Sequence, residues 1–198
     1  MIVGANPPAR ALGKALQQLG SRVLLTDSSW ENIRAARMEE LPTYFGNPAS
    51  QHADAHLDLV GLGHLLGLSP AGEINTLASM RFRHDFGHQR QFALASGLEA
   101  QRTDKHRASG EHRGRPLGSR SLTYTQLANE LTQGAELYST QLTEGFDWND
   151  YQALHGQRAT LLFARDNHGW VHVFTPNTVL KPGPGWTVVA LVQRAPPG

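Results

Sequence analysis

Short apolar runs alternate with amphipathic stretches along the first half of the chain. Ile2-Val3 is apolar, and Arg10 to Leu19 carries apolar residues at spacings of three and four, as a helix with one buried face does. Gly20 can end this helix, because glycine adopts the left-handed conformation common after a helix. Val23 to Leu25 is a second apolar run, followed by Asp27. The pattern predicts a strand, a glycine turn, a helix, a second strand and an acid, in this order.

The same alternation continues to about residue 95. Ser28 or Ser29 can cap a helix over Trp30 to Met38. The further predicted elements are a strand over Leu41 to Phe45, a brief helix from Ser50 through His56, a strand over His64 to Leu68, a helix over Glu73 to Arg83 and a strand over Gln91 to Ala95. Strands that alternate with helices in this way predict an α/β fold with a parallel sheet and helices on both faces.

The composition changes after residue 96, and we predict three parts: an α/β domain over 1–96, a polar basic linker over 97–121 and a small α+β module over 122–198. The linker range lacks interleaved aromatic residues that could stack nucleobases, so a solvated linker is favoured over a nucleic-acid or lipid surface. The predicted elements of the module are a helix over Thr123 to Leu131 and strands over Ala135 to Leu142, Ala159 to Ala164, Val171 to Phe174 and Thr187 to Val192.

Composition excludes several classes of protein. Hydrophobic residues make up 39% of the 198 residues and charged residues 18%, which is typical of globular proteins. The net charge of +1 gives no argument for nucleic-acid binding, and the lack of cysteine excludes disulfides and thiol catalysis. No apolar run reaches the length of a membrane span, and no signal peptide precedes the first strand. Because so few residues precede Gly4, we expect the chain to be a piece of a longer protein.

The first turn resembles the glycine-rich turn of a Rossmann dinucleotide-binding unit. Gly4, Asn6 and Ala9 occupy the three positions of the G-x-G-x-x-G/A pattern, and Asp27 follows Gly4 by 23 residues. In such units the helix N-terminus binds a pyrophosphate, and the acid accepts hydrogen bonds from the ribose. Asn6 replaces a glycine, so we expect its side chain where the pyrophosphate would approach. Pro7 and Pro8 lack N–H groups that could bind phosphate.

Motifs along the whole chain resemble one family. Gly4 to Ala9, Asp27, Gly46-Asn47, Leu68-Ser69 and Asn75 follow the order seen in TrkA-N domains, the Rossmann half of RCK (regulator of K⁺ conductance) modules. Ala-Leu-Gly-Lys-Ala-Leu at 11–16 and Asn-Ile-Arg-Ala-Ala-Arg at 32–37 resemble the versions attached to monovalent cation/proton antiporters. Phe163 to Arg165, Thr175-Pro176 and Val179 to Gly183 resemble the companion TrkA-C module.

The resemblance implies a regulatory domain at the cytoplasmic face of the inner membrane that binds an adenine nucleotide, NAD(H) or AMP. It would gate a cation/proton antiporter whose membrane transport domain belongs to the same polypeptide, and it would form a homodimer without binding nucleic acid. Asp27 disfavours NADP, because a carboxylate repels a 2′-phosphate. The implied nucleotide contacts are Gly4, Ala5, Asn6, Pro7, Pro8, Ala9 and Arg10 in the turn, Asp27 and Ser28 at the ribose, Gly46 and Asn47 at the adenine, and Ser69 and Asn75 closing the pocket.

Other patterns leave alternatives open. His52 and His56 have the i, i+4 spacing of metal ligands, but no third ligand stands at a motif spacing. We therefore predict no metal site, and we interpret His84 and His88, which are spaced alike, as capping residues of a helix C-terminus. No Tyr-x-x-x-Lys pair or nucleophile elbow is present, so we predict no catalytic residues and no enzyme. The two alternatives are a small NAD-dependent oxidoreductase and a Rossmann scaffold that has lost its ligand and acts by protein contacts.

Overall fold

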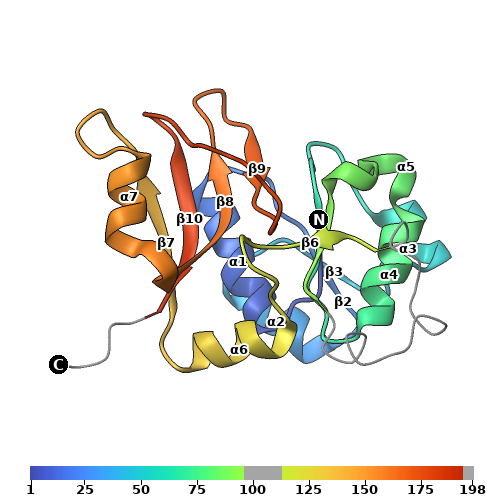
Figure 1. The fold of residues 1–198 in the computed structure, drawn as a ribbon. Helices are drawn as coiled ribbons and strands as arrows, with labels where there is room; N and C mark the ends of the chain where they lie inside the picture. Colours follow the sequence, from blue (N-terminus) through green and yellow to red (C-terminus); the bar gives the residue numbers. More distant parts are fainter. Residues whose placement is uncertain (96–112, 194–198) are drawn as a thin grey trace, which may run out of the picture.

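Helices and strands alternate through the first half of the chain, as the hydrophobic pattern predicts (Figure 1). The computed structural model describes residues 1–95 and 113–193, and residues 96–112 and 194–198 lie outside the described part. The elements of the first half are β1 (Ile2–Val3), α1 (Pro7–Gln18), β2 (Leu25–Asp27), α2 (Trp30–Met38), β3 (Thr43–Phe45), α3 (Gln51–His56), β4 (Leu65–Gly67), α4 (Gly72–Arg81), α5 (Arg83–Phe86), the 3₁₀ turn η1 (His88–Arg90) and β5 (Gln91–Ala93).

Together with β6 (Arg115–Pro116), these strands form a parallel sheet with the strand order β3-β2-β1-β4-β5-β6. This order reverses between β1 and β4, so the chain builds outward from β1 in both directions, as a Rossmann sheet does. The predicted α/β class is therefore confirmed. Short strands suffice here, because each is hydrogen-bonded to its neighbours and covered by helices.

The sixth strand lies in a range for which we predicted a linker. Arg115–Pro116 forms β6 and pairs in parallel with Phe92 and Ala93 of β5, and the next residue, Leu117, is fully buried. This end of the 97–121 range therefore belongs to the sheet. A strand of two residues, one of them proline, is too short to show a period-two pattern, so periodicity cannot predict it. The linker prediction for residues 97–112 falls outside the described residues.

The two faces of the parallel sheet are covered by different helices. Ile2 and Leu66 point to the face covered by α1 and α2, where they join the largest apolar cluster. Val3 and Leu65, each one residue away, pack on the opposite face with Phe82 and the residues of α4 and α5. The side chains of neighbouring strand residues therefore pack against helices on opposite faces of the sheet, which confirms the prediction of helices on both faces.

The second half of the chain forms a smaller antiparallel sheet with the order β7-β10-β8-β9. A hairpin turn around residues 166–169 joins β8 to β9, the second and third of the strands predicted for the module. The elements are α6 (Tyr124–Thr132), β7 (Glu136–Gln141), α7 (Trp148–His155), the 3₁₀ turn η4 (Gly156–Arg158), β8 (Ala159–Arg165), β9 (Val171–Val173) and β10 (Thr187–Val192). We missed α7, although a capping box of Asp147 and Asp150 marks its start.

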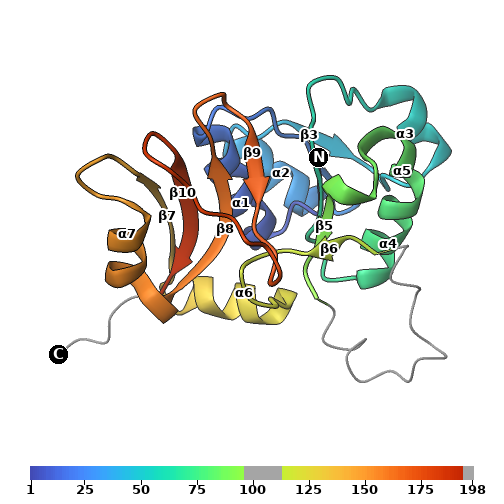
Figure 2. The same cartoon turned by 45° about the horizontal axis from the view of Figure 1, so that its top comes forward.

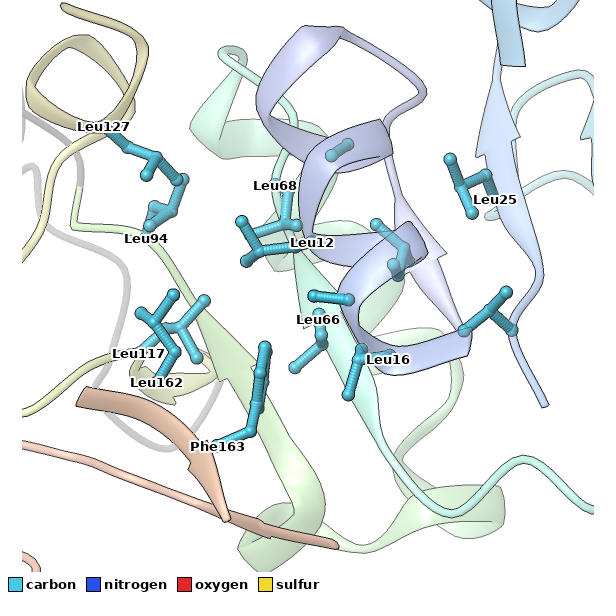
Figure 3. Packing of buried hydrophobic residues seen from close by; sticks show 14 of the residues in the cluster. Leu12, Leu16, Leu25, Leu66, Leu68, Leu94, Leu117, Leu127, Leu162 and Phe163 are labelled. Atoms are coloured by element: carbon cyan, nitrogen blue, oxygen red, sulfur yellow. The ribbon is translucent and has the colours of Figure 1, made fainter. Parts of the chain in front are cut away.

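Helix α1 lies between the two sheets (Figures 1 and 2). Its residues Leu12 and Leu16 belong to the same apolar cluster as Leu162 and Phe163 of β8, and α6 adds Leu127 (Figure 3). α1 also contacts both α6 and β7. The two sheets therefore share one core through the helix that begins at the glycine turn.

Candidate functional site

The turn between β1 and α1 requires glycine at its first position. Gly4 has a φ of 111°, which side-chain-bearing residues rarely adopt, and its N–H donates to the Thr26 carbonyl (N···O 2.7 Å). A Cβ added at Gly4 would lie 2.9 Å from Asn6 Nδ2 and 3.2 Å from the Leu68 carbonyl oxygen. The turn therefore places β1, the end of β2 and the end of β4 in close contact.

Asn6 is buried and ties this turn together. Its Nδ2 donates to the Leu68 carbonyl at 2.8 Å, and its Oδ1 accepts the N–H of Ala9 at 3.1 Å, which caps α1. We expected the side chain where a pyrophosphate would approach, but it turns toward β4 and toward its own helix. Asn6 thus replaces the glycine of the fingerprint with a structural amide.

The two prolines occupy the first two positions of α1. Proline is well accommodated there, because the first N–H groups of a helix have no partner within the helix. Pro8 and Ala9 are buried, whereas Pro7 is exposed. Arg10 turns back, and its guanidinium donates to the Ala5 carbonyl at 2.9 Å and pairs with Glu39 at 2.8 Å.

Asp27 lies at the end of β2, as predicted, and its carboxylate binds three N–H donors. Oδ2 accepts the backbone N–H of Ala5 at 2.8 Å and an amide hydrogen of Asn32 at 3.0 Å, while Oδ1 accepts the N–H of Ser29 at 2.8 Å. A carboxylate offers about four acceptor positions. About one position, on Oδ1, is therefore left for a hydroxyl of a ligand.

A cavity of about 330 Å³ opens beside Asp27, where the strand order reverses between β1 and β4. We call it the switch-point cavity, because ligands of open α/β sheets bind at this place. Five of the predicted site residues line it: Gly4, Asp27, Ser28, Asn47 and Ser69. The predicted residues outside its lining are Ala5, Asn6, Pro7, Pro8, Ala9, Arg10, Gly46 and Asn75. Sequence reasoning missed the other lining residues, Val3, Thr26, Pro48, Ala71 and Ile74, although each lies next to or near a strand end that it identified.

Asn75 closes the turn after β4. Its Oδ1 accepts the Ser69 N–H at 3.1 Å and its Nδ2 donates to the Ser69 carbonyl at 2.8 Å. A Cβ at Gly67 would lie 2.8 Å from the Cβ of Asn75, so glycine is needed for this close approach. Asn75 therefore holds Ser69 in place at the cavity wall.

The turn after β3 supplies the far wall of the cavity. The Gly46 N–H donates to the Asp27 carbonyl at 2.8 Å, which fixes this turn beside β2. Asn47 Oδ1 accepts the N–H of Ala49 at 2.9 Å. Within the described residues the Nδ2 of Asn47 has no acceptor, so this amide can donate to a ligand.

The fold and the cavity together define a Rossmann-like α/β protein with a cavity at its switch point, lined by Asp27 and a few other polar residues. No family model and no curated protein matches the sequence. Among solved structures, the chain is similar to the NAD(P)-binding domain of an exopolyphosphatase-related protein from Archaeoglobus fulgidus. The TM-score is 0.43 and the identity 22%, over 50% of this chain and 76% of that chain.

The chain is also similar to two GsuK structures. For the GsuK RCK domain the TM-score is 0.43 and the identity 10%, over 97% of this chain and 43% of that chain. For the GsuK channel bound to NAD the TM-score is 0.42 and the identity 14%, over 96% of this chain and 36% of that chain. This chain thus spans less than half the length of either GsuK chain. At these TM-scores the ligand has to be argued from this chain's own residues.

The histidine pair on α3 is not part of the lining of the switch-point cavity. The rings of His52 and His56 stack with centroids 3.9 Å apart, His52 Nδ1 lies 3.0 Å from the Tyr44 hydroxyl, and His56 Nδ1 lies 2.8 Å from the His52 carbonyl. Within residues 1–95 and 113–193, no group of three histidine, cysteine or acidic residues could hold a metal ion. No helix in this part of the chain is long and apolar enough to cross a membrane.

A second cavity of about 280 Å³ lies at the opposite edge of the parallel sheet, between the start of β4 and the β8–β9 hairpin. His64 lines it, and burial lowers the pKa of this histidine to about 4, with smaller contributions from the Met1 ammonium, Arg90 and His172. The folded protein therefore prefers neutral His64.

Acid is expected to destabilise the protein through His64. The unfolded chain takes up this proton near the ordinary pKa of about 6.5, before the folded state does, so stability falls as the pH drops from 6.5 through about 4. The expected loss is up to about 2 kcal/mol, discounted for the partial exposure of the ring. Urea unfolding between pH 7 and pH 4 would measure it. In His64→Leu this part of the pH dependence should vanish, and an unchanged slope would contradict the assignment.

Proposed function

We propose that this chain is a regulatory domain that binds an adenine nucleotide, NAD(H) or AMP, in the switch-point cavity. The observation that carries this proposal is the position of Asp27, which ends β2, lines the cavity and keeps an acceptor position on Oδ1. A ribose hydroxyl can donate to this oxygen, as it does to the acid at the end of the second strand in Rossmann units.

The rest of the cavity suits the base and the sugar. Ile74 offers an apolar wall, and the free amide hydrogens of Asn47 can donate to a ring nitrogen of adenine. Ser69 Oγ accepts from the Ala71 N–H at 3.2 Å, so its own hydrogen is available to a ligand oxygen. The arrangement is typical of a pocket that holds its ligand by a few polar groups beside an apolar wall.

We further propose that the domain regulates an attached monovalent cation/proton antiporter, in line with the family that its motifs resemble. α1 begins beside the cavity and packs against α6 and β7, so a ligand that favours one position of α1 also favours one position of the second sheet. Such a ligand shifts the population of domain arrangements by its difference in affinity for them. The proposed assembly is a homodimer, and a strictly monomeric species in light scattering at high protein concentration would count against it.

Isothermal titration with NADH, NAD, AMP and ATP tests the nucleotide site. Asp27→Ala should weaken micromolar binding about tenfold or more, which corresponds to about 1.4 kcal/mol, because the ribose loses its acceptor. Asn47→Ala should also weaken binding, and Glu144→Ala, which removes an exposed carboxylate far along the chain, serves as the control.

Because Asp27 also holds Ala5, Ser29 and Asn32, the thermal stability of each variant without ligand is measured as well. No heat and no thermal shift with any of the four nucleotides would refute the proposed site. We propose binding without turnover, so NADH absorbance should stay constant during the titration, and steady NADH consumption would favour the oxidoreductase alternative.

A further inference from the structure

In a Rossmann unit, backbone N–H groups of the glycine turn and the helix start bind the pyrophosphate. In this chain nearly all of these N–H groups are absent or already donate to acceptors within the protein. Pro7 and Pro8 have no N–H, and the N–H of Ala9 donates to Asn6 Oδ1. The N–H of Gly4 donates to Thr26, and that of Ala5 to Asp27. Among residues 4–9, all of which are described, only Asn6 keeps an N–H without an acceptor in the structure.

Charge at the cavity also disfavours phosphate. Asp27 is the one ionisable side chain among the lining residues that the structure describes, and it is acidic. Arg10, the basic residue that follows the glycine turn in sequence, pairs with Glu39 and donates to the Ala5 carbonyl. The pKa of Glu39 is lowered by the hydrogen bonds from Lys14 and Arg10, which outweigh the effect of its burial. Among the lining residues that the structure describes, none is a cation that could neutralise a phosphate.

Opening the turn to phosphate would break buried contacts. Asn6 would have to give up the Leu68 carbonyl and the Ala9 N–H, and a buried carbonyl without a donor is costly. The bond from Ala5 to Asp27 would also have to break, although Asp27 is the residue that would hold the ribose. The internal hydrogen bonds of the turn therefore keep phosphate from its N–H groups, while Asp27 Oδ1 can still accept a hydrogen bond from a ribose hydroxyl.

We propose that the switch-point cavity recognises its ligand through the adenosine moiety and gains no affinity from phosphate. The ligand class then extends to phosphate-free adenosine compounds, and the phosphates of NAD(H) or AMP stay in solvent. This inference rests on the proposed function and names the part of the ligand that the site reads. Two observations carry the proposal. The N–H groups of residues 4–9, apart from that of Asn6, are absent or already donate within the protein. The one charged side chain among the described lining residues is the carboxylate of Asp27.

Titrations of the whole chain with adenosine, AMP and NADH at the same ionic strength test this inference. Adenosine should bind as tightly as AMP and NADH, to within about threefold, or more tightly. Tighter binding of AMP or NADH than of adenosine by more than about threefold would overturn the inference and leave the proposed function standing. No binding of adenosine, AMP or NADH would refute the proposed function, and the inference with it.

A proline variant tests the cause directly. Pro7→Ala/Pro8→Ala restores two N–H groups at the start of α1, so AMP should gain at least about threefold in affinity relative to adenosine. Pro176→Ala, at an exposed proline in the C-terminal part, is the matched control and should leave this ratio unchanged. The ratio of two ligands on one variant is independent of any loss of stability. An unchanged ratio in the double variant would overturn the assignment of phosphate exclusion to the closed turn.

Discussion

Phe163→Ala is expected to lower the free energy of unfolding by about 3 to 5 kcal/mol, in one transition that includes both sheets. Phe163 is fully buried on β8 and belongs to the cluster that contains Leu12 and Leu16 of α1 (Figure 3). Truncating it leaves a cavity between the antiparallel sheet and the helix of the parallel sheet. The loss of stability should therefore affect the parallel sheet and the antiparallel sheet alike.

Urea unfolding followed by two probes measures this effect. Far-UV circular dichroism reports on both sheets, whereas fluorescence reports mainly on the second half, which contains Trp148, Trp170 and Trp186. Coincident transitions that shift together are expected for a shared core. Val179→Ala, at a side chain that is 92% exposed, should change stability by less than about 0.5 kcal/mol. Two separate transitions, of which only the fluorescent one moves in Phe163→Ala, would contradict a shared core.

The shared core explains what the sequence could and could not reveal. Periodicity shows that α1 has a buried face, and local signals mark the helix starts at Ser29, Ser50 and Thr123, where the structure finds side-chain caps. These signals depend on neighbours in the chain. Which sheet packs on the far side of α1 depends on Phe163, about 150 residues away, and no local pattern encodes that contact.

The candidate site likewise combines features that the local sequence predicts with contacts between distant residues that it does not predict. The glycine turn and the acid at the end of β2 are local features, and the structure places Gly4 and Asp27 together at the cavity. The bonds from Ala5 to Asp27 and from Asn6 to Leu68 join separate strand ends, so they became visible only in the folded sheet. Because the Asn6 side chain bonds the Leu68 carbonyl, it supports the turn and does not protrude into the cavity.

Gly4→Ala is expected to cost about 2 to 4 kcal/mol of stability, the second large effect. A φ of 111° costs an alanine about 1 to 3 kcal/mol in backbone strain. The new methyl would also lie 2.9 Å from Asn6 Nδ2 and 3.2 Å from the Leu68 carbonyl oxygen, so the bond between these two groups has to shift. Chemical denaturation at pH 7 gives the loss, and ligand titration should show weaker binding, because Gly4 lines the switch-point cavity.

Gly20→Ala is the comparison variant without crowding. Gly20 also has a positive φ, of 78°, but nothing lies within 4 Å of an added Cβ, so its substitution should cost only the strain of a left-handed residue, about 1 kcal/mol. The difference between the two variants measures the crowding at the Asn6–Leu68 bond together with the extra backbone strain of a φ of 111° over one of 78°. Equal losses would mean that Asn6 yields to the methyl group at no cost. The turn would then be free to open, and the structural basis for excluding phosphate would be lost.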